Sequence, residues 1–278
     1  MNELALFAGA GGGLYGSAIL GWRTVCAVEI DPYCRRVLAA RRDDGTWPEV
    51  EIHDDVRGQL EQLDLGVVGG FGPFDGRPWC GRVDVITGGF PCQDISAAGR
   101  KAGIDGDKSG LWSEYRRIVA EVEPAFVFAE NSADLRSRGL ARILGDLDAM
   151  GFDAEWACLS AGAVGAPHER DRLWLLAAHR ARALAHSDRK GQLRASGEAP
   201  GPTLEGGQRP RDGGMDPDGN PWTAEPAVGR VAHGVAFGGD RLRALGNGQV
   251  PLVAATAACG LAARFGLDWR PTGGLVAC

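Results

Sequence analysis

The chain has 278 residues, of which 44% are hydrophobic and 24% are charged, and its formal net charge is −6. This composition is ordinary for a soluble globular protein, and the length predicts one large domain with a smaller one. No uninterrupted apolar run reaches membrane-spanning length, so a membrane is excluded as a partner. The negative charge counts against a broad basic surface for nucleic acid, although a locally positive cleft stays compatible with it.

The cysteines are informative through their number and spacing. There are seven, irregularly placed, and no CxxC pair occurs. This pattern favours reduced thiols over a disulfide framework or a zinc site. The first residues carry no early Lys or Arg, which a signal peptide would need. We therefore expect a cytoplasmic protein that uses no metal.

Short apolar runs alternate with longer helical patterns through the first two-thirds of the chain. The expected strands are 4–7, 24–29, 83–87, 125–130 and 172–177, and the helices between them are 31–42, 110–122 and 133–151. Such alternation is typical of an α/β protein with a mostly parallel, doubly wound sheet that carries helices on both faces.

The pattern changes near His179. Segment 186–230 is rich in Gly and Pro and has no clean periodicity, which predicts a small loop-rich region. Residues 250–265 then show the apolar spacing of a helix again.

A glycine-rich loop, "GAGGG" at 9–13, joins the first strand to a helix, and the second strand ends at Glu29. Glycines allow a ligand to approach the backbone, and a carboxylate after the second strand is suited to ribose hydroxyls. A tight turn and a helix-capping carboxylate are the alternatives. The pair together favours a cofactor that contains a nucleoside, with NAD and S-adenosylmethionine as candidates.

Reactive side chains lie at the ends of three strands. Cys92 stands in "GGFPCQDIS", Glu130 closes the strand "AFVFAE", and Arg170 and Arg172 open "RDRLWLL". Open α/β sheets bind ligands at the carboxyl ends of their strands, so these groups are expected to converge beside the glycine loop. Each alone is more often a buried thiol, a surface carboxylate or a solvated arginine. Their common position favours a functional site.

Five motifs occur in the order found in DNA (cytosine-5) methyltransferases, namely "LFAGAGG", "GGFPCQDIS", "AENS", "PHERDRLW" and "ALGNGQVP". The chain therefore resembles this family, in particular its short phage and prophage members, from residue 6 to 251. Only the linking segment 179–229 resembles nothing in it.

The resemblance implies a Rossmann-like, S-adenosylmethionine-dependent methyltransferase fold, and enzymes of this family often accompany a restriction enzyme. A catalytic and cofactor-binding domain would span 1–178, a small target-recognition region 179–239, and a C-terminal segment 240–278 would return to the first domain. Double-stranded DNA is the implied partner, and a monomer is the expected state.

The resemblance also implies the chemistry. Carbon 5 of cytosine is a poor nucleophile, so the Cys92 thiolate would first add to carbon 6 of a flipped-out base. Glu130 would hold the base and donate a proton, and Arg172 would contact its carbonyl oxygen. The residues carried over as catalytic are Cys92, Pro91, Glu130, Asn131, Arg170 and Arg172.

S-adenosylmethionine is the cofactor that the resemblance implies. The residues matched to its pocket are Phe7, Gly9, Gly11, Glu29, Ile30, Asp55, Val56, Leu111 and Asn247. Asp54 is a close rival of Asp55 in "HDDV". Three other functions stay open: an RNA cytosine methyltransferase, a nucleic-acid-binding module without catalysis, and a nicotinamide oxidoreductase.

Overall fold

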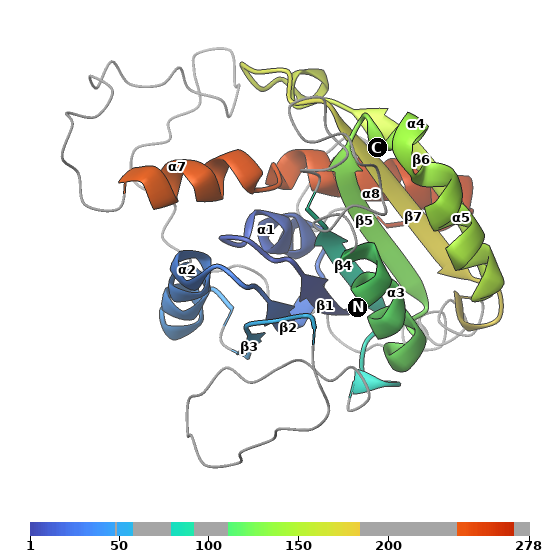
Figure 1. The fold of residues 1–278 in the computed structure, drawn as a ribbon, viewed down its shortest axis with the longest axis horizontal. Coiled ribbons are helices and arrows are strands. Elements are labelled where there is room, and N and C mark those ends of the chain that lie inside the picture. The colour runs from blue at the N-terminus through green and yellow to red at the C-terminus, as the bar shows by residue number, and fades with distance from the viewer. Residues whose placement is uncertain (48, 58–78, 92–110, 184–237, 270–278) are drawn as a thin grey trace.

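The computed structural model describes residues 1–47, 49–57, 79–91, 111–183 and 238–269 (Figure 1). Cys92 and most of the predicted target-recognition region lie outside the described residues. No helix in the described ranges is both long and apolar enough to cross a membrane.

A seven-stranded sheet forms the centre of the molecule, in the order β3-β2-β1-β4-β5-β7-β6 (Figure 1). Its strands are β1 (Asn2–Leu6), β2 (Arg23–Val28), β3 (Glu51–His53), β4 (Val85–Gly89), β5 (Phe126–Ser132), β6 (Phe152–Leu159) and β7 (Arg172–His179). Strands β1 to β5 are parallel, and β7 runs antiparallel between β5 and β6. The mostly parallel sheet is thus confirmed. Its strand order reverses between β1 and β4, which is where sheets of this type bind ligands.

Helices cover both faces of the sheet, as predicted for a doubly wound α/β fold. They are α1 (Gly12–Ile19), α2 (Pro32–Asp43), α3 (Leu111–Val122), α4 (Leu135–Arg138), α5 (Leu140–Ala149), α7 (Gly238–Asn247) and α8 (Pro251–Arg264). In the view of Figure 1, α3 and α5 lie in front of the sheet and α8 lies behind it. Helices α1 and α2 share the face of α8.

Each face has its own core. On the α3 face, Trp112, Tyr115 and Ile118 recur at helical spacing and pack on apolar strand residues. Full burial of one such side chain contributes about 1.5–3 kcal/mol. On the other face, α8 buries mainly small residues, which permit close approach to α1. A Cβ placed on Gly16 would lie 2.9 Å from the Cβ of Ala254.

Several elements differ from the sequence-based expectation. The single helix predicted at 133–151 is interrupted at Gly139, where α4 ends and α5 begins. Strands β3 and β6 and helix α7 were not predicted. Strand β6 is an edge strand that exposes Asp153 and leaves most of its other residues half-buried, so it lacks an alternating apolar pattern. Strand β3 has three residues, too few for a recognisable period.

A carboxylate is completely buried within the sheet at Glu3 of β1. Its oxygens accept hydrogen bonds from the hydroxyls of Ser17 and Thr87, each at 2.6 Å, and from the hydroxyl of Thr24. Burial raises the pKa of Glu3 above its ordinary value of 4.5, and the three hydroxyls oppose that rise. The ionised form is therefore less favourable in the folded chain than in the unfolded chain.

This buried group predicts a pH dependence of stability. The folded chain holds the Glu3 proton to a higher pH than the unfolded chain does, so the Glu3 contribution falls as the pH rises above about 4.5. Glu3→Gln cannot ionise, and its free energy of unfolding should decline less between pH 5 and pH 8 than that of the wild type. Urea denaturation at both pH values measures this difference. Equal declines would contradict the prediction.

Candidate functional site

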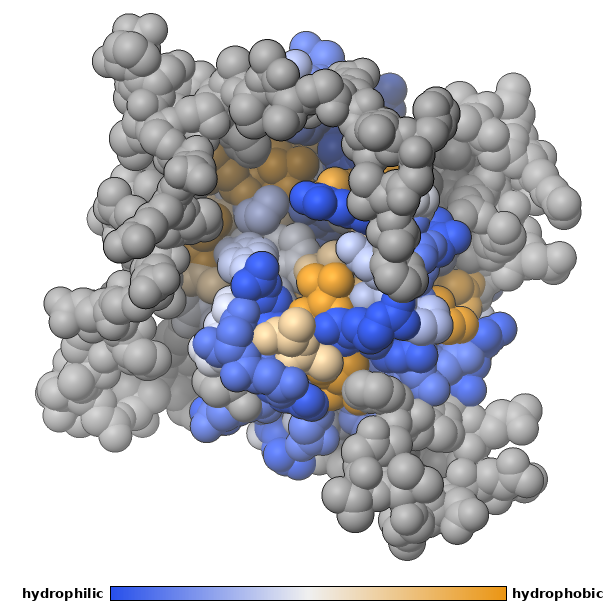
Figure 2. Space-filling model, turned by 90° about the vertical axis from the view of Figure 1, so that its left-hand side faces the viewer, coloured by the Kyte–Doolittle hydropathy of each residue, from blue (hydrophilic) through white to orange (hydrophobic). Residues whose placement is uncertain are grey.

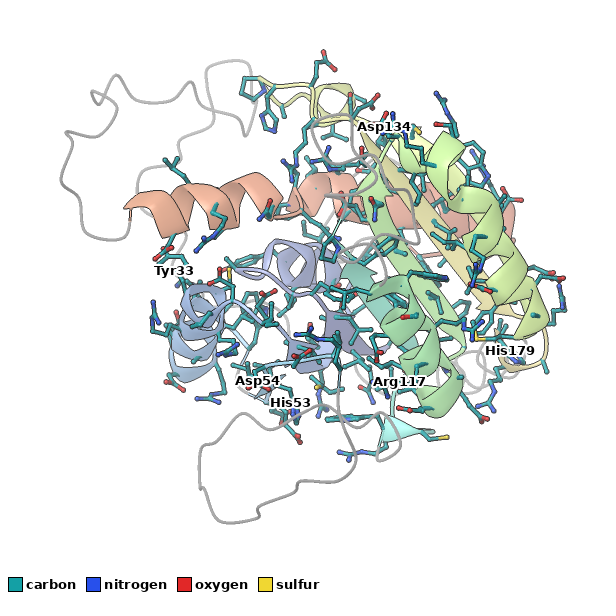
Figure 3. The ribbon with its side chains drawn as sticks, viewed as in Figure 1. Tyr33, His53, Asp54, Arg117, Asp134 and His179 are labelled. Carbon is teal, nitrogen blue, oxygen red and sulfur yellow. The ribbon has the colours of Figure 1, made fainter. Side chains whose placement is uncertain are left out.

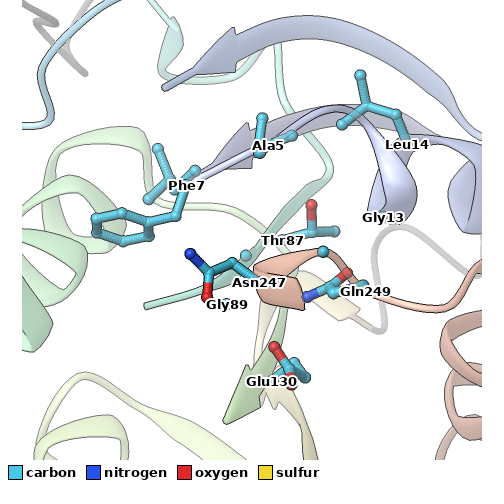
Figure 4. A pocket seen from close by; sticks show the side chains of 14 residues that line it. Ala5, Phe7, Gly13, Leu14, Thr87, Gly89, Glu130, Asn247 and Gln249 are labelled. Carbon is cyan, nitrogen blue, oxygen red and sulfur yellow. The ribbon is translucent and has the colours of Figure 1, made fainter. Parts of the chain in front are cut away.

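A pocket lies where the strand order reverses, between β1 and β4 (Figure 4). Its wall combines the carboxyl ends of β1 and β4, the start of α1, one residue of β5 and the turn between α7 and α8. The predicted site residues in this wall are Phe7, Gly9, Glu130 and Asn247. Residues in the wall that the motif comparison did not assign include Ala5, Gly13, Thr87 and Gln249.

The loop from β1 to α1 has a left-handed backbone at three predicted residues. The φ angles are 52° at Phe7, 56° at Gly9 and 93° at Gly11. A Cβ on Gly9 would meet no atom within 4 Å, so this glycine leaves room on the pocket side. A Cβ on Gly11 would lie 2.4 Å from Cη2 of Trp47. Gly9 therefore leaves space for a ligand, whereas Gly11 permits packing within the protein.

Glu29 connects two loops at the edge of this site. Its Oε2 accepts the backbone N–H of Gly9 at 2.7 Å, and its Oε1 accepts that of Asp31 at 2.8 Å. Burial raises the pKa of Glu29, and the two amide donors oppose the rise. The neighbouring side chain of Ile30 is 58% exposed. The carboxylate thus shapes the glycine loop, with an apolar surface beside it.

Other predicted cofactor residues lie outside the pocket wall. Asp55 accepts hydrogen bonds from the backbone and the guanidinium of Arg57 at 2.8–3.0 Å, and this arginine lowers the pKa of the carboxyl group. Its rival Asp54 follows His53 at the carboxyl end of β3 (Figure 3).

Val56 and Leu111 belong to the core on the α3 face of the sheet. Val56 is buried, and its carbonyl oxygen accepts a hydrogen bond from Arg117 at 2.6 Å.

Glu130 and Arg172 form an ion pair across β5 and β7. Oε1 of Glu130 lies 2.8 Å from Nε of Arg172, and only 9% of the glutamate side chain is exposed. Burial raises the pKa of Glu130, while Arg172, Arg170 and a hydrogen bond from Gln249 oppose the rise. Such a carboxyl group is suited to exchanging a proton with a bound ligand.

Asn131 is buried directly after Glu130. Its Nδ2 donates to the carbonyl oxygen of Phe90 at 3.0 Å, and its Oδ1 accepts the backbone N–H of Ser132 at 2.8 Å. Asn131 therefore anchors the backbone that leads into Pro91. The thiol of Cys92, one residue further, lies outside the described residues.

Arg170 is bound to the turn between α7 and α8. Its Nη1 and Nη2 donate to the carbonyl oxygens of Gly246 and Gly248 at 2.8 and 2.6 Å. These bonds hold a distant segment of the chain beside Glu130. In the sequence, this turn is marked by the motif "ALGNGQVP". The motif led to the prediction of Asn247 as a site residue, but not of Gln249.

Comparison with known proteins identifies one matching family model. The model described as C-5 cytosine-specific DNA methylase matches residues 1–196. Among curated proteins, the chain is 30% identical over 185 residues to the type II methyltransferase M2.BsuMI of Bacillus subtilis. This match includes 64% of the present chain and 42% of M2.BsuMI. It is 31% identical over 179 residues to M.Eco47II of Escherichia coli, covering 38% of that protein with 63% of its own length.

A viral protein is also similar. The chain is 34% identical over 131 residues to the type II methyltransferase M.CviJI of Paramecium bursaria Chlorella virus IL3A, covering 36% of that protein with 46% of its own length. The matched parts therefore span less than half of these relatives. Among solved structures, a DNA modification methyltransferase encoded within an E. coli prophage is 25% identical with a TM-score of 0.47, over 65% of this chain and 47% of the other.

Proposed function

Because this chain belongs to the C-5 cytosine-specific DNA methylase family, we propose that it transfers a methyl group from S-adenosylmethionine to carbon 5 of a flipped-out cytosine in double-stranded DNA. The observation that carries the proposal is the ion pair of the buried Glu130 with Arg172, beside the pocket that the glycine loop helps to form. A carboxyl group with a raised pKa beside a guanidinium matches what activation of a cytosine ring requires.

In the proposed reaction, the Cys92 thiolate adds to carbon 6 of cytosine and forms a C–S bond. Glu130 gives its proton to the ring nitrogen as negative charge moves there, so that carbon 5 becomes nucleophilic. After carbon 5 is methylated, a base removes the proton from carbon 5. The electrons of the broken C–H bond restore the double bond between carbons 5 and 6, and the C–S bond breaks to release Cys92 as a thiolate. The ring nitrogen returns its proton to Glu130, which is then ready for another turnover.

The residues present fit S-adenosylmethionine, whose role would be to supply the methyl group. Gly9 leaves open space in the pocket, and the Phe7 ring borders it (Figure 4). Glu29 would accept hydrogen bonds from the ribose, and the exposed side chain of Ile30 would cover the adenine. Asn247 would complete the pocket, while Asp55 or Asp54 would face the adenine amine.

The predicted division into domains is part of this proposal. Residues 1–178 would form the catalytic domain, 179–239 would recognise the target sequence, and 240–278 would return to the catalytic domain. Packing of α8 against β6, β7 and α1 supports the last of these. The enzyme would act as a monomer in the cytoplasm, where its cysteines stay reduced.

In the space-filling view of Figure 2, hydrophilic residues surround several separate hydrophobic areas on the described part of this face.

The direct test is a methyl-transfer assay with labelled S-adenosylmethionine on duplex DNA and on tRNA. We expect label in the duplex DNA, and bisulfite sequencing of DNA from expressing cells should locate 5-methylcytosine in one sequence context. Label in tRNA alone would favour the RNA methyltransferase. Binding of a nicotinamide cofactor without methyl transfer would favour the oxidoreductase.

The cofactor assignment predicts a loss of affinity in Glu29→Ala. The variant loses the charged acceptor for the ribose hydroxyls and the two backbone bonds that shape the glycine loop. Affinity for S-adenosylmethionine should fall about tenfold or more. Calorimetric titration measures this, and Glu49→Ala, which removes an exposed carboxylate paired with Arg23, is the control. Unchanged affinity in Glu29→Ala would limit the carboxylate to a structural role.

A further inference from the structure

Gln249 connects the start of α1 to Glu130. Its backbone oxygen lies so close to Gly12 that a Cβ there would approach it to 2.3 Å. Its Oε1 lies 2.5 Å from the position of a Cβ on Gly13. The first turn of α1 therefore accommodates Gln249 only because it is built from glycine.

The other end of the same carboxamide faces the catalytic carboxyl group. The Gln249 side chain faces Glu130 and favours the ionised form of its carboxyl group. Both its Nε2 and Oε2 of Glu130 lie over Gly89, at 3.2 and 2.4 Å from the position of a Cβ on that glycine. An ionised carboxylate only accepts hydrogen bonds, so Nε2 of Gln249 is the end of the carboxamide that can donate to Glu130. Figure 4 shows Gln249 between Gly13 and Glu130.

The turn that contains Gln249 is also held by Arg170. Arg170 binds the carbonyl oxygens of Gly246 and Gly248, the two residues that flank Asn247. Pro251 begins α8 two residues after Gln249, so the turn is short. Rigid attachment on both sides leaves the carboxamide little freedom to move away from Glu130.

We propose that Gln249 is a positioning residue for Glu130. Its carboxamide packs against the glycines at the start of α1 and orients the Glu130 carboxyl group toward the ring of the target cytosine. This inference rests on the proposed function. It assigns Arg170 the role of holding the turn that carries Gln249, and it leaves Arg172 as the guanidinium that faces Glu130 directly.

The contact has a consequence for protonation. The charged and hydrogen-bonding side chains that face Glu130 from the described elements are Arg172, Arg170 and Gln249, and each favours its ionised form. Removal of the Gln249 donor should therefore raise the pKa of Glu130. Glu130 acts as a proton donor in the proposed reaction, so the decline of kcat at high pH should move to higher pH.

The test compares Gln249→Met, Gln249→Glu and a matched control. Met has a similar length but donates no hydrogen bond, whereas Glu has the same shape and places a like charge beside Glu130. Thr256→Ala is the control, because that hydroxyl lies further along α8 and donates to the carbonyl oxygen of Leu252. NMR titration of the Glu130 carboxyl carbon measures the pKa of this group directly, so the result does not depend on methyl transfer.

We expect the Glu130 pKa to rise in Gln249→Met, to rise further in Gln249→Glu, and to stay unchanged in Thr256→Ala. The kcat of Gln249→Met should fall about tenfold at neutral pH, with its high-pH decline displaced upward. A Glu130 pKa unaffected by both Gln249 variants would overturn the inference. If the Gln249 variants show the expected rise in the Glu130 pKa but the wild type methylates no cytosine, the proposed function is overturned instead.

Discussion

Cys92→Ser is expected to abolish methyl transfer while affinity for S-adenosylmethionine stays close to that of the wild type. A serine hydroxyl is far less ionised than a thiol at neutral pH, so it cannot add to carbon 6 of the ring at a useful rate. The change leaves the residues proposed to bind the cofactor untouched. In the described structure, Asn131 holds the carbonyl oxygen of Phe90, so the backbone that leads to position 92 should be preserved.

The measurement pairs a methyl-transfer assay with calorimetric titration of S-adenosylmethionine. Cys80→Ser provides a matched control, since that thiol is exposed and its nearest polar partner is Glu123 at 3.9 Å. The control should keep full activity. Trapping with DNA that contains 5-fluorocytosine should give a covalent complex for the wild type and none for Cys92→Ser. Substantial methylation by Cys92→Ser would show that another residue is the nucleophile.

Glu130→Gln should lower kcat by about a thousandfold, because the amide cannot donate a proton to the ring nitrogen as a carboxyl group does. Its shape is nearly unchanged, so the pocket should keep its affinity for the cofactor. The variant also loses the ion pair with Arg172 but no longer has to bury a carboxylate. These two effects oppose each other, so the loss of stability should be small beside the loss of rate.

Single-turnover methylation rates and thermal unfolding separate the two effects. Glu155→Gln is the matched control, because that glutamate lies on β6 and pairs with Arg264 at 3.1 Å in an exposed position. It should leave both the rate and the melting temperature close to those of the wild type. If Glu130→Gln retained more than about a tenth of the wild-type rate, proton donation by Glu130 would be excluded as a main contribution.

The sequence alone was sufficient for the fold class and for most of the elements that build the pocket. Apolar runs bounded by glycine or polar residues predicted β1, β2, β4, β5 and β7, because strands that are buried on both faces of a sheet need nearly continuous apolar segments. These signals are local, as is the glycine loop before α1. The family motifs lie at these strand ends, which allowed the site residues to be predicted together.

Other features depended on contacts between residues that are distant in sequence. The short strand β3 and the edge strand β6 are defined by pairing with β2 and β7, not by their own apolar patterns. The roles of the glycines were likewise undetermined, since Gly9 faces open space while Gly12 accommodates Gln249. Only the tertiary structure shows that Gln249 lies beside Glu130 and that Arg170 binds the turn before α8. A contact between segments that are distant in sequence leaves no periodic pattern in either segment, so the sequence could not predict it.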